Sequence, residues 1–172
     1  MKKKHLFYWF MLAFLLMLSA CQTRWLNTEH SIVFNTFWNS EVLYRHMQDK
    51  DPFFNAHFLD LDTGIEKQNN KTDVYFFMDC GSGGCSAGFW NLNGARFTKY
   101  GEEKPDRASC KILLDKIEDI DWKRSTIYEQ EGVFSCVLTA EGRYGWVYYR
   151  SQNLSLFNSA EAEITYYIWD NE

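Results

Sequence analysis

Four cysteines offer the clearest covalent chemistry in this chain of 172 residues: Cys80, Cys85, Cys110 and Cys136. An even number of cysteines indicates two disulfides if the chain is exported to an oxidising compartment. Zinc binding is the alternative, but zinc-binding cysteines usually come in C-x-x-C pairs, which this sequence does not contain. We therefore predict that all four cysteines are disulfide-bonded and that none binds a metal.

Two of the three possible pairings have support from the local sequence. The segment from Cys80 to Cys85 contains three glycines and can close a tight ring, which favours Cys80–Cys85 and leaves Cys110 with Cys136. Strand phase favours another pairing, because Cys80 and Cys136 each share a face with apolar residues of their strands and would meet in the core. We predict the first pairing, and Cys80–Cys136 stays open as the alternative.

Three histidines in the first third of the mature chain could ligate a metal: His30, His46 and His57. Carboxylates lie nearby in the sequence, and Asp49 would share a helix face with His46 at three-residue spacing. The other nearby carboxylates are Glu41 and Asp51. The sequence has no H-E-x-x-H or comparable ligand signature. We therefore expect core or surface histidines, and neither a metal nor another cofactor.

The segment that begins at Asp60 resembles two known motifs only in part. Asp62-Thr63-Gly64 resembles the active-site triplet of aspartic proteases, but Ile65 stands where that family has Ser or Ala, and the sequence has no second triplet. Asp60-Leu61-Asp62 begins like a calcium loop, but Gly64 and Lys71 stand at positions five and twelve, where ligands are required. We predict a turn between two elements.

Ser82 lies among glycines, but its surroundings do not form a catalytic motif. The nucleophile elbow requires G-x-S-x-G, and Cys80 occupies the place of the first glycine. The same glycines lack the Lys and the Ser or Thr of a phosphate-binding loop. We therefore predict no catalytic residue and expect the protein not to be an enzyme.

The first 20 residues have the composition of a secretory signal. Three lysines, Lys2 to Lys4, precede an uncharged apolar stretch of 13 residues from Leu6 to Leu18, and the small residues Ser19 and Ala20 follow. A helix that crosses the hydrocarbon core needs about 20 residues, so this stretch is short for a retained membrane anchor. We predict that residues 1–20 are removed on export.

The run Leu18-Ser19-Ala20-Cys21 resembles the lipobox of bacterial lipoproteins at all four positions. In that family the cysteine thiol receives a diacylglycerol, the signal is cut before the cysteine, and the new amino group is usually acylated. The resemblance therefore implies lipid attachment at Cys21. Two or more acyl chains, at about 0.8 kcal/mol per buried methylene, hold a protein stably in a bilayer.

Gln22, which follows the lipidated position, bears on the choice of membrane. In enterobacterium-like sorting an Asp at this position favours retention in the inner membrane, so Gln22 favours an outer-membrane lipoprotein that faces the periplasm. Residues 21–28 form a short lipidated tether, which would hold a single globular domain, residues 29–172, close to the bilayer.

The predicted mature chain is acidic and rich in aromatic residues. It has 152 residues, with 15 basic and 23 acidic side chains, a net charge of −8 with histidine neutral. This charge is a poor match for nucleic acid or anionic lipid. Aromatic residues make up 18% of the whole chain and are spread along it, which favours a packed β-rich core. Some of the rings could instead line a ligand groove.

Alternating apolar and polar residues predict strands along most of the mature chain. These strands are Ser31–Phe37, Val74–Cys80, Ser86–Leu92, Ala95–Tyr100, Ser125–Tyr128, Val133–Thr139, Tyr144–Arg150, Leu154–Phe157 and Ile164–Trp169. Asn93-Gly94 is a strong hairpin signal and predicts that the two strands beside it pair with each other.

Two helices complete the predicted elements. The first begins near Ser40 and ends before Pro52, and the second follows Pro105-Asp106 with Leu113, Ile117 and Ile120 at helical spacing. The fold class predicted from these elements is α+β and β-rich, an antiparallel sheet of about seven strands in a sandwich or barrel-like form with one or two helices.

The function expected from these features is that of a lipoprotein that binds a protein or another envelope component without catalysis. An inhibitor of lysozyme-like cell-wall hydrolases is one alternative, because small disulfide-bonded β-barrel lipoproteins of that kind exist and lysozymes are cationic. A hydrolase with paired carboxylates is another. The expected partners are the membrane, through the N-terminal lipid, and an envelope component, but not nucleic acid.

The lipid assignment predicts the behaviour of the variant Cys21→Ser. We expect this variant to lose acyl labelling and membrane retention completely, because serine offers no thiol for the diacylglycerol. Labelling with radioactive palmitate, followed by membrane fractionation, measures both properties. Acyl labelling that persists in the variant would show that the lipid is not on Cys21.

Overall fold

The computed structural model of the protein describes residues 26–37, 56–81, 84–116, 126–127, 131–155 and 159–170. Its elements are β1 (Glu29–Phe37), β2 (His57–Leu59), β3 (Val74–Gly81), β4 (Gly84–Asn91), β5 (Arg96–Gly101), α3 (Arg107–Asp115), β6 (Thr126–Ile127), β7 (Phe134–Leu138), β8 (Tyr144–Ser155) and β9 (Ser159–Ile168). The signal, most of the tether and the helix predicted near Ser40 lie outside these residues. Within them, no helix is long and apolar enough to cross a membrane.

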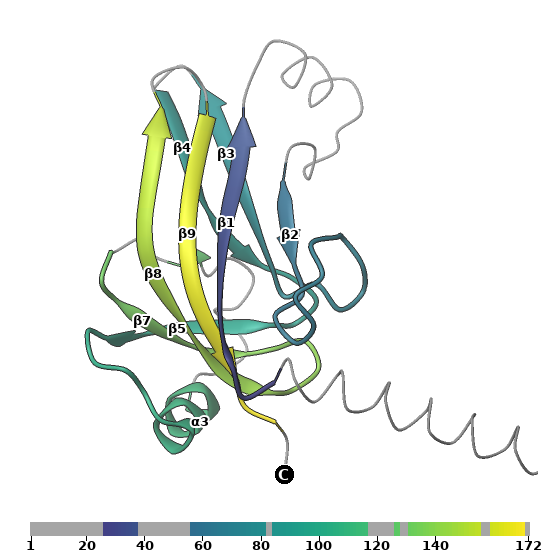
Figure 1. The fold of residues 1–172 in the computed structure, drawn as a ribbon, viewed down its shortest axis with the longest axis vertical. Coiled ribbons are helices and arrows are strands. Elements are labelled where there is room, and N and C mark those ends of the chain that lie inside the picture. The colour runs from purple at the N-terminus through teal and green to yellow at the C-terminus, as the bar shows by residue number, and fades with distance from the viewer. Residues whose placement is uncertain are drawn as a thin grey trace, which may run out of the picture.

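The strands form two antiparallel sheets. One has the order β1-β9-β8-β7-β5, and the other has the order β2-β3-β4-β6, in which β6 contributes only two residues. Figure 1 shows β1, β9 and β8 lying across β3 and β4. The sheets are not closed into a barrel. The predicted β-rich α+β class is therefore confirmed, in its sandwich form.

The core between the sheets is built largely from aromatic rings. Phe89 on β4 is fully buried and lies 4.9 Å from Phe34, 4.8 Å from Phe76 and 5.8 Å from Tyr149, measured between ring centroids. These partners come from β1, β3 and β8. The ring of Phe89 therefore connects β4 with three other strands, and both sheets contribute to the contact. Each buried large apolar side chain contributes about 1.5–3 kcal/mol. The prediction that the aromatic residues form a packed core is confirmed for this group.

A buried carboxylate also links the two sheets. One oxygen of Asp73, just before β3, accepts a hydrogen bond from the backbone N–H of Leu61 at 2.7 Å. The other oxygen accepts one from the N–H of Ala140 at 2.5 Å. Leu61 lies between β2 and β3, whereas Ala140 lies in the turn between β7 and β8. The Asp73 side chain therefore fastens a loop of the smaller sheet to a turn of the larger one.

The pairing predicted at Asn93-Gly94 is wrong, although the turn itself is present. Both residues have positive φ, 51° and 83°, and the N–H of Ala95 donates to the carbonyl of Leu92 at 2.9 Å. However, β4 pairs with β3 and β6, whereas β5 pairs with β7 in the other sheet. The turn is thus a corner between sheets, because Phe97 and its partner Val137 bury their side chains in the core and fix β5 against β7.

Helix α3 covers part of the outer face of the larger sheet. Its N-cap Asp106 accepts a hydrogen bond from the N–H of Ser109 at 2.7 Å, as the sequence position of this residue suggests. Cys110 and Leu114 are buried, and Cys110 forms a disulfide with Cys136 of β7. The Cys110–Cys136 prediction is therefore confirmed, and Cys80–Cys136 is excluded.

The second predicted disulfide, Cys80–Cys85, stays a prediction. The register of β3 and β4 places these two residues directly opposite each other, next to the pair Gly81 and Gly84. This backbone arrangement is compatible with a disulfide across the hairpin. The side chains of Cys80 and Cys85 lie outside the described part of the structure.

Two strands differ from their predicted limits. A single strand, β8, runs from Tyr144 to Ser155 where two strands were predicted, because a bulge at Arg150 shifts the register instead of ending the strand. The short strand β2 was not predicted, since three residues are too few to show an alternation. The other predicted strands match observed strands to within a few residues, apart from the early start of β9 at Ser159.

Candidate functional site

The outer face of the larger sheet carries a row of aromatic side chains. Strand geometry sends alternate residues to opposite faces, so Val147 and Tyr149 of β8 point into the core while Trp146 and Tyr148 point outward. Cross-strand register places Phe134 of β7 opposite Tyr148. The centroid of the Phe134 ring lies 4.5 Å from the ring centroid of Tyr148 and 5.3 Å from that of Trp146. Two neighbouring strands, β7 and β8, thus present one connected aromatic surface.

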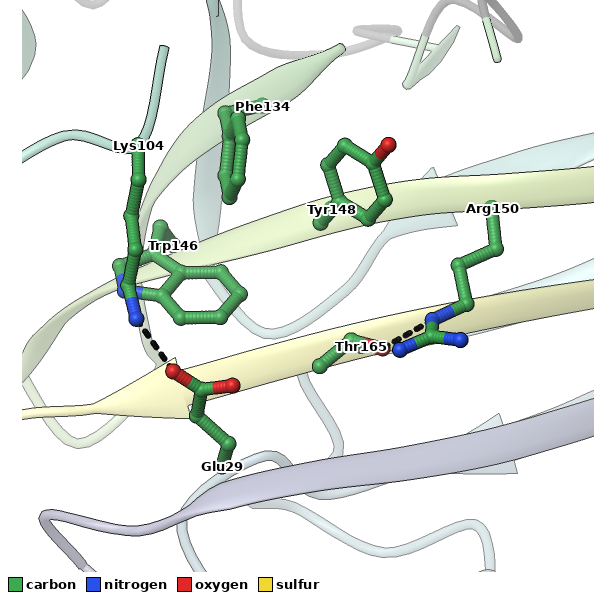
Figure 2. A pocket seen from close by; sticks show the side chains of 7 residues that line it. All are labelled: Glu29, Lys104, Phe134, Trp146, Tyr148, Arg150 and Thr165. Carbon is green, nitrogen blue, oxygen red and sulfur yellow. Dashed lines mark hydrogen bonds and ion pairs between the residues drawn. The ribbon is translucent and has the colours of Figure 1, made fainter. Parts of the chain in front are cut away.

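These rings line a shallow hollow of about 110 Å³ (Figure 2). Polar side chains surround them: Glu29 from β1, Lys104 from the loop before α3, Arg150 from β8 and Thr165 from β9. Glu29 and Lys104 are 75 residues apart in the sequence. Only the folded sheet therefore assembles this group.

Lys104 lies across the indole of Trp146. Its ammonium nitrogen is 4.7 Å from the ring centroid and forms an ion pair with Glu29. Figure 2 shows the lysine side chain passing along the indole, with its nitrogen directed at the Glu29 carboxylate. Trp146 is only 2% exposed, although it points away from the main core. The hollow thus already holds one cation by a cation–π contact and a carboxylate, an arrangement that attracts ammonium and guanidinium groups.

Arg150 borders the other side of the hollow. Its Nε donates to the hydroxyl of Thr165 at 2.7 Å, and its side chain is 51% exposed, with Glu163 3.6 Å away. Thr165 also forms a hydrogen bond with Ser31 at 3.0 Å. The bulge in β8 at Arg150 breaks the regular alternation there and fixes where this side chain leaves the strand.

A second cluster of ionisable groups lies at the junction of the two sheets. Asp60, Asp62 and Asp73 are all 3% exposed or less, and each offers a carboxylate oxygen within 4.8 Å of the other two. Among the described residues this is the only group of three or more His, Cys, Asp or Glu side chains that could hold a metal ion. Arg143 and Glu141 lie beside it, with Arg143 Nη1 3.1 Å from an Asp62 oxygen.

The turn predicted after Asp60 is confirmed. The N–H of Gly64 donates to the carbonyl of Asp60 at 2.7 Å, and the N–H of Asp60 donates to the carbonyl of Ile65 at 3.0 Å. Gly64 has φ of 70°, which a glycine adopts readily. The side chain of Asp62 is fully buried, so it cannot act on a substrate as an aspartic-protease carboxylate does.

Burial strongly affects the protonation of this cluster. Burial raises the pKa of Asp73 to about 8, against the smaller opposing effect of its hydrogen bond from Ala140. Burial also raises the pKa of Asp62, and the opposing effects of Thr139 and Arg143 offset this rise only in part. The pKa of Glu141 is lowered, mainly because Lys71 donates a hydrogen bond to its carboxylate. Burial therefore favours the neutral form of Asp73 at neutral pH, and it shifts the pKa of Asp62 in the same direction.

Two of the three histidines examined in the sequence lie in the described residues and belong to no metal cluster there. His57 Nε2 lies 2.6 Å from Glu66, and its Nδ1 accepts the N–H of Asn35 at 3.3 Å. His30 forms a hydrogen bond with Thr28 at 2.8 Å. His46, together with the acidic residues near it in the sequence, lies outside the described residues.

Sequence reasoning missed the hollow as a site. The alternation of β8 indicates that its aromatic residues fall on both faces of the sheet. This is the only feature of the sequence that points to an aromatic surface on the outer face. No feature of the sequence near Lys104 indicates that its side chain lines the hollow. Searches against protein-family models, curated proteins and solved structures each find no match to this chain. The site is therefore described from its geometry alone.

The raised pKa of Asp73 predicts how stability depends on pH in metal-chelating buffer. The folded-state pKa of about 8 lies above the unfolded value of 3.8, so folding takes up a proton between these values. The stabilisation is complete below about pH 4 and is lost as pH rises through 8. We expect the free energy of unfolding to fall between pH 5 and 8, by at most about 1.4 kcal/mol per pH unit for one proton.

Urea denaturation at several pH values measures this slope. The variant Asp73→Asn is the control, since it cannot titrate and should flatten the pH dependence even if it lowers stability throughout. A free energy of unfolding that stays constant or rises from pH 5 to 8 in the wild-type protein would contradict the assignment.

Proposed function

We propose that this protein is a lipid-anchored envelope protein that binds a partner through the hollow formed around Trp146, without catalysis. The signal and lipobox residues support the anchor. The exposed polar groups around a connected aromatic surface support binding. Surfaces of this composition, with aromatic anchors inside a polar rim, are typical of recognition sites.

The observation that carries the proposal is the position of Lys104. An ammonium group lies over the Trp146 ring and pairs with Glu29, so the hollow already holds the chemical group that it suits best. A lysine or arginine side chain of a partner would use the same ring and carboxylate by displacing Lys104. The net charge of −8 on the predicted mature chain favours the approach of a basic partner.

The short tether supports a position of this hollow near the membrane. Glu29, which lines the hollow, lies eight positions after Cys21. A fully extended chain of that length spans about 30 Å at most. A partner bound here would therefore lie close to the bilayer surface, as expected for a component of the cell envelope.

Site-specific photocrosslinking in intact envelopes tests this proposal. We replace Tyr148 with a photoreactive benzoylphenylalanine, which keeps an aromatic ring in the hollow, and make the same replacement at Ile112 as a control. Ile112 is 57% exposed on helix α3, away from the hollow. We expect a discrete crosslinked product from position 148 and none from position 112.

Two charge variants sharpen the test. Glu29→Gln should lower the crosslinking yield several-fold, because it removes the carboxylate that pairs with the cation. Lys104→Met should raise the yield, because the competing internal cation is gone while the side chain keeps its length. A yield that neither variant changes, or equal products from positions 112 and 148, would refute binding in the hollow.

A further inference from the structure

The hollow around Trp146 has a second charged end, which the binding of a cation leaves unused. Figure 2 shows Lys104 and Trp146 at one end of the hollow and Arg150 at the other. The Nε of Arg150 donates to Thr165 and lies 3.6 Å from Glu163, but neither Nη group donates a hydrogen bond to any of the described residues. The exposed Nη groups are therefore available to an acceptor on a ligand.

Strand register sets the distance between the two ends. Glu29 of β1 and Trp146 of β8 both lie opposite Tyr167 of β9. Thr165, which accepts the hydrogen bond from Arg150, lies two residues before Tyr167 on the same strand. Two residues of a strand cover about 7 Å. The place for a cation and the place for an anion in this hollow are therefore about 7 Å apart.

The charges around the hollow favour a ligand that carries both signs. Lys104 and Arg150 are paired with the carboxylates of Glu29 and Glu163. Lys104 stays attached beside the hollow when its ammonium group is displaced, so a bound cation alone would leave three positive charges facing two negative ones. A ligand that also brings an anion to Arg150 restores the balance of charge.

We propose that the ligand of this hollow is the C-terminal lysine of a protein partner, with its ammonium over Trp146 and its α-carboxylate on Arg150. This inference rests on the proposed function, because it requires that a cation of the partner enters the hollow. Six bonds join the ammonium nitrogen of a lysine to its carboxylate carbon, so the nearly extended residue holds the two charges about 7 Å apart. The planar guanidinium donates two parallel hydrogen bonds to a carboxylate.

The aromatic rings suit the apolar part of a lysine side chain. Phe134 and Tyr148 lie beside Trp146 and line the same hollow. Lysine buries its methylene groups on apolar surface and keeps its ammonium group in a polar environment. Lys104 already lies along the Trp146 indole in this manner. A lysine of the partner would make the same kind of contact.

The distance between the charges favours a terminal lysine over the headgroup of phosphatidylethanolamine, which also carries an ammonium group and an anion. Only four bonds join the nitrogen of that headgroup to its phosphorus, so the two charges are about 5 Å apart. The headgroup therefore reaches one end of the hollow but not both.

Fluorescence anisotropy tests this assignment with the lipidated protein in detergent micelles. The probes are the peptide Gly-Ser-Gly-Ser-Lys, labelled at its amino terminus and with a free C-terminal carboxylate, and the same peptide with a C-terminal amide. We expect the amide to bind about ten-fold more weakly, because the carboxylate that Arg150 binds is absent. Glycerophosphoethanolamine should displace the free-acid peptide far less well than the unlabelled peptide does.

Two variants assign the preference to Arg150. Arg150→Gln should bind both peptides equally, with the affinity that the wild-type protein has for the amide. The matched control Arg107→Gln, at the start of α3 and outside the hollow, should keep the wild-type preference for the free acid. Glu29→Gln should weaken the binding of both peptides. The comparison of the two peptides on the wild-type protein decides the question if Arg150→Gln does not fold.

Three outcomes would overturn the assignment. Equal affinity of the wild-type protein for the acid and the amide, with both weakened by Glu29→Gln, would leave the proposed binding of a cation intact but exclude a terminal lysine. Displacement by glycerophosphoethanolamine at the same concentration as by the unlabelled peptide would indicate a lipid headgroup. Absence of binding of either peptide would also exclude a terminal lysine, while photocrosslinking at position 148 decides the proposed function separately.

Discussion

The Asp73 carboxylate is the interaction on which the arrangement of the two sheets depends. Its two oxygens accept N–H groups from Leu61 and Ala140, which lie in connections of different sheets and are 79 positions apart in the sequence. Its own backbone N–H and carbonyl bond to Leu59 and Leu92. Four chain segments therefore meet at one buried residue. Aromatic packing stabilises the contact between the sheets. The hydrogen bonds of Asp73 fix the relative position of the sheets, because hydrogen bonds are directional and apolar contacts are not.

The same arrangement bears on the binding that we propose for the outer face of the larger sheet. The inward residues of β8 and β9 are buried in the core between the sheets. The neighbouring residues point outward and can be covered only by elements outside that core. Helix α3 covers one part of this face through Cys110 and Leu114, and Lys104 covers Trp146 beside it. The helix is fixed by a disulfide, whereas Lys104 is held by an exposed ion pair of small net stability. The part of this face under Lys104 is therefore the part that a partner would uncover in the binding that we propose.

Local patterns predicted most of the strands, the helix start at Asp106 and one disulfide, because each depends on residues that are close in sequence or on cysteine parity. Pairing was harder. Asn93-Gly94 has the conformation of a hairpin turn, yet its strands enter different sheets, because long-range burial of Phe97 against β7 outweighs the local preference. The hollow and the acidic cluster were not predictable. Glu29 meets Lys104, and Asp62 meets Arg143, only after distant strands have paired.

Amide hydrogen exchange in wild-type protein and in Asp73→Ala tests most directly whether this carboxylate joins the sheets. The amides of Leu61 and Ala140 are compared with those of Phe97 and Val137, which report the core in the same sample. Our account predicts that in the variant the Leu61 and Ala140 amides both exchange much faster than the core amides. If both keep their wild-type protection relative to the core, Asp73 does not hold the sheets together.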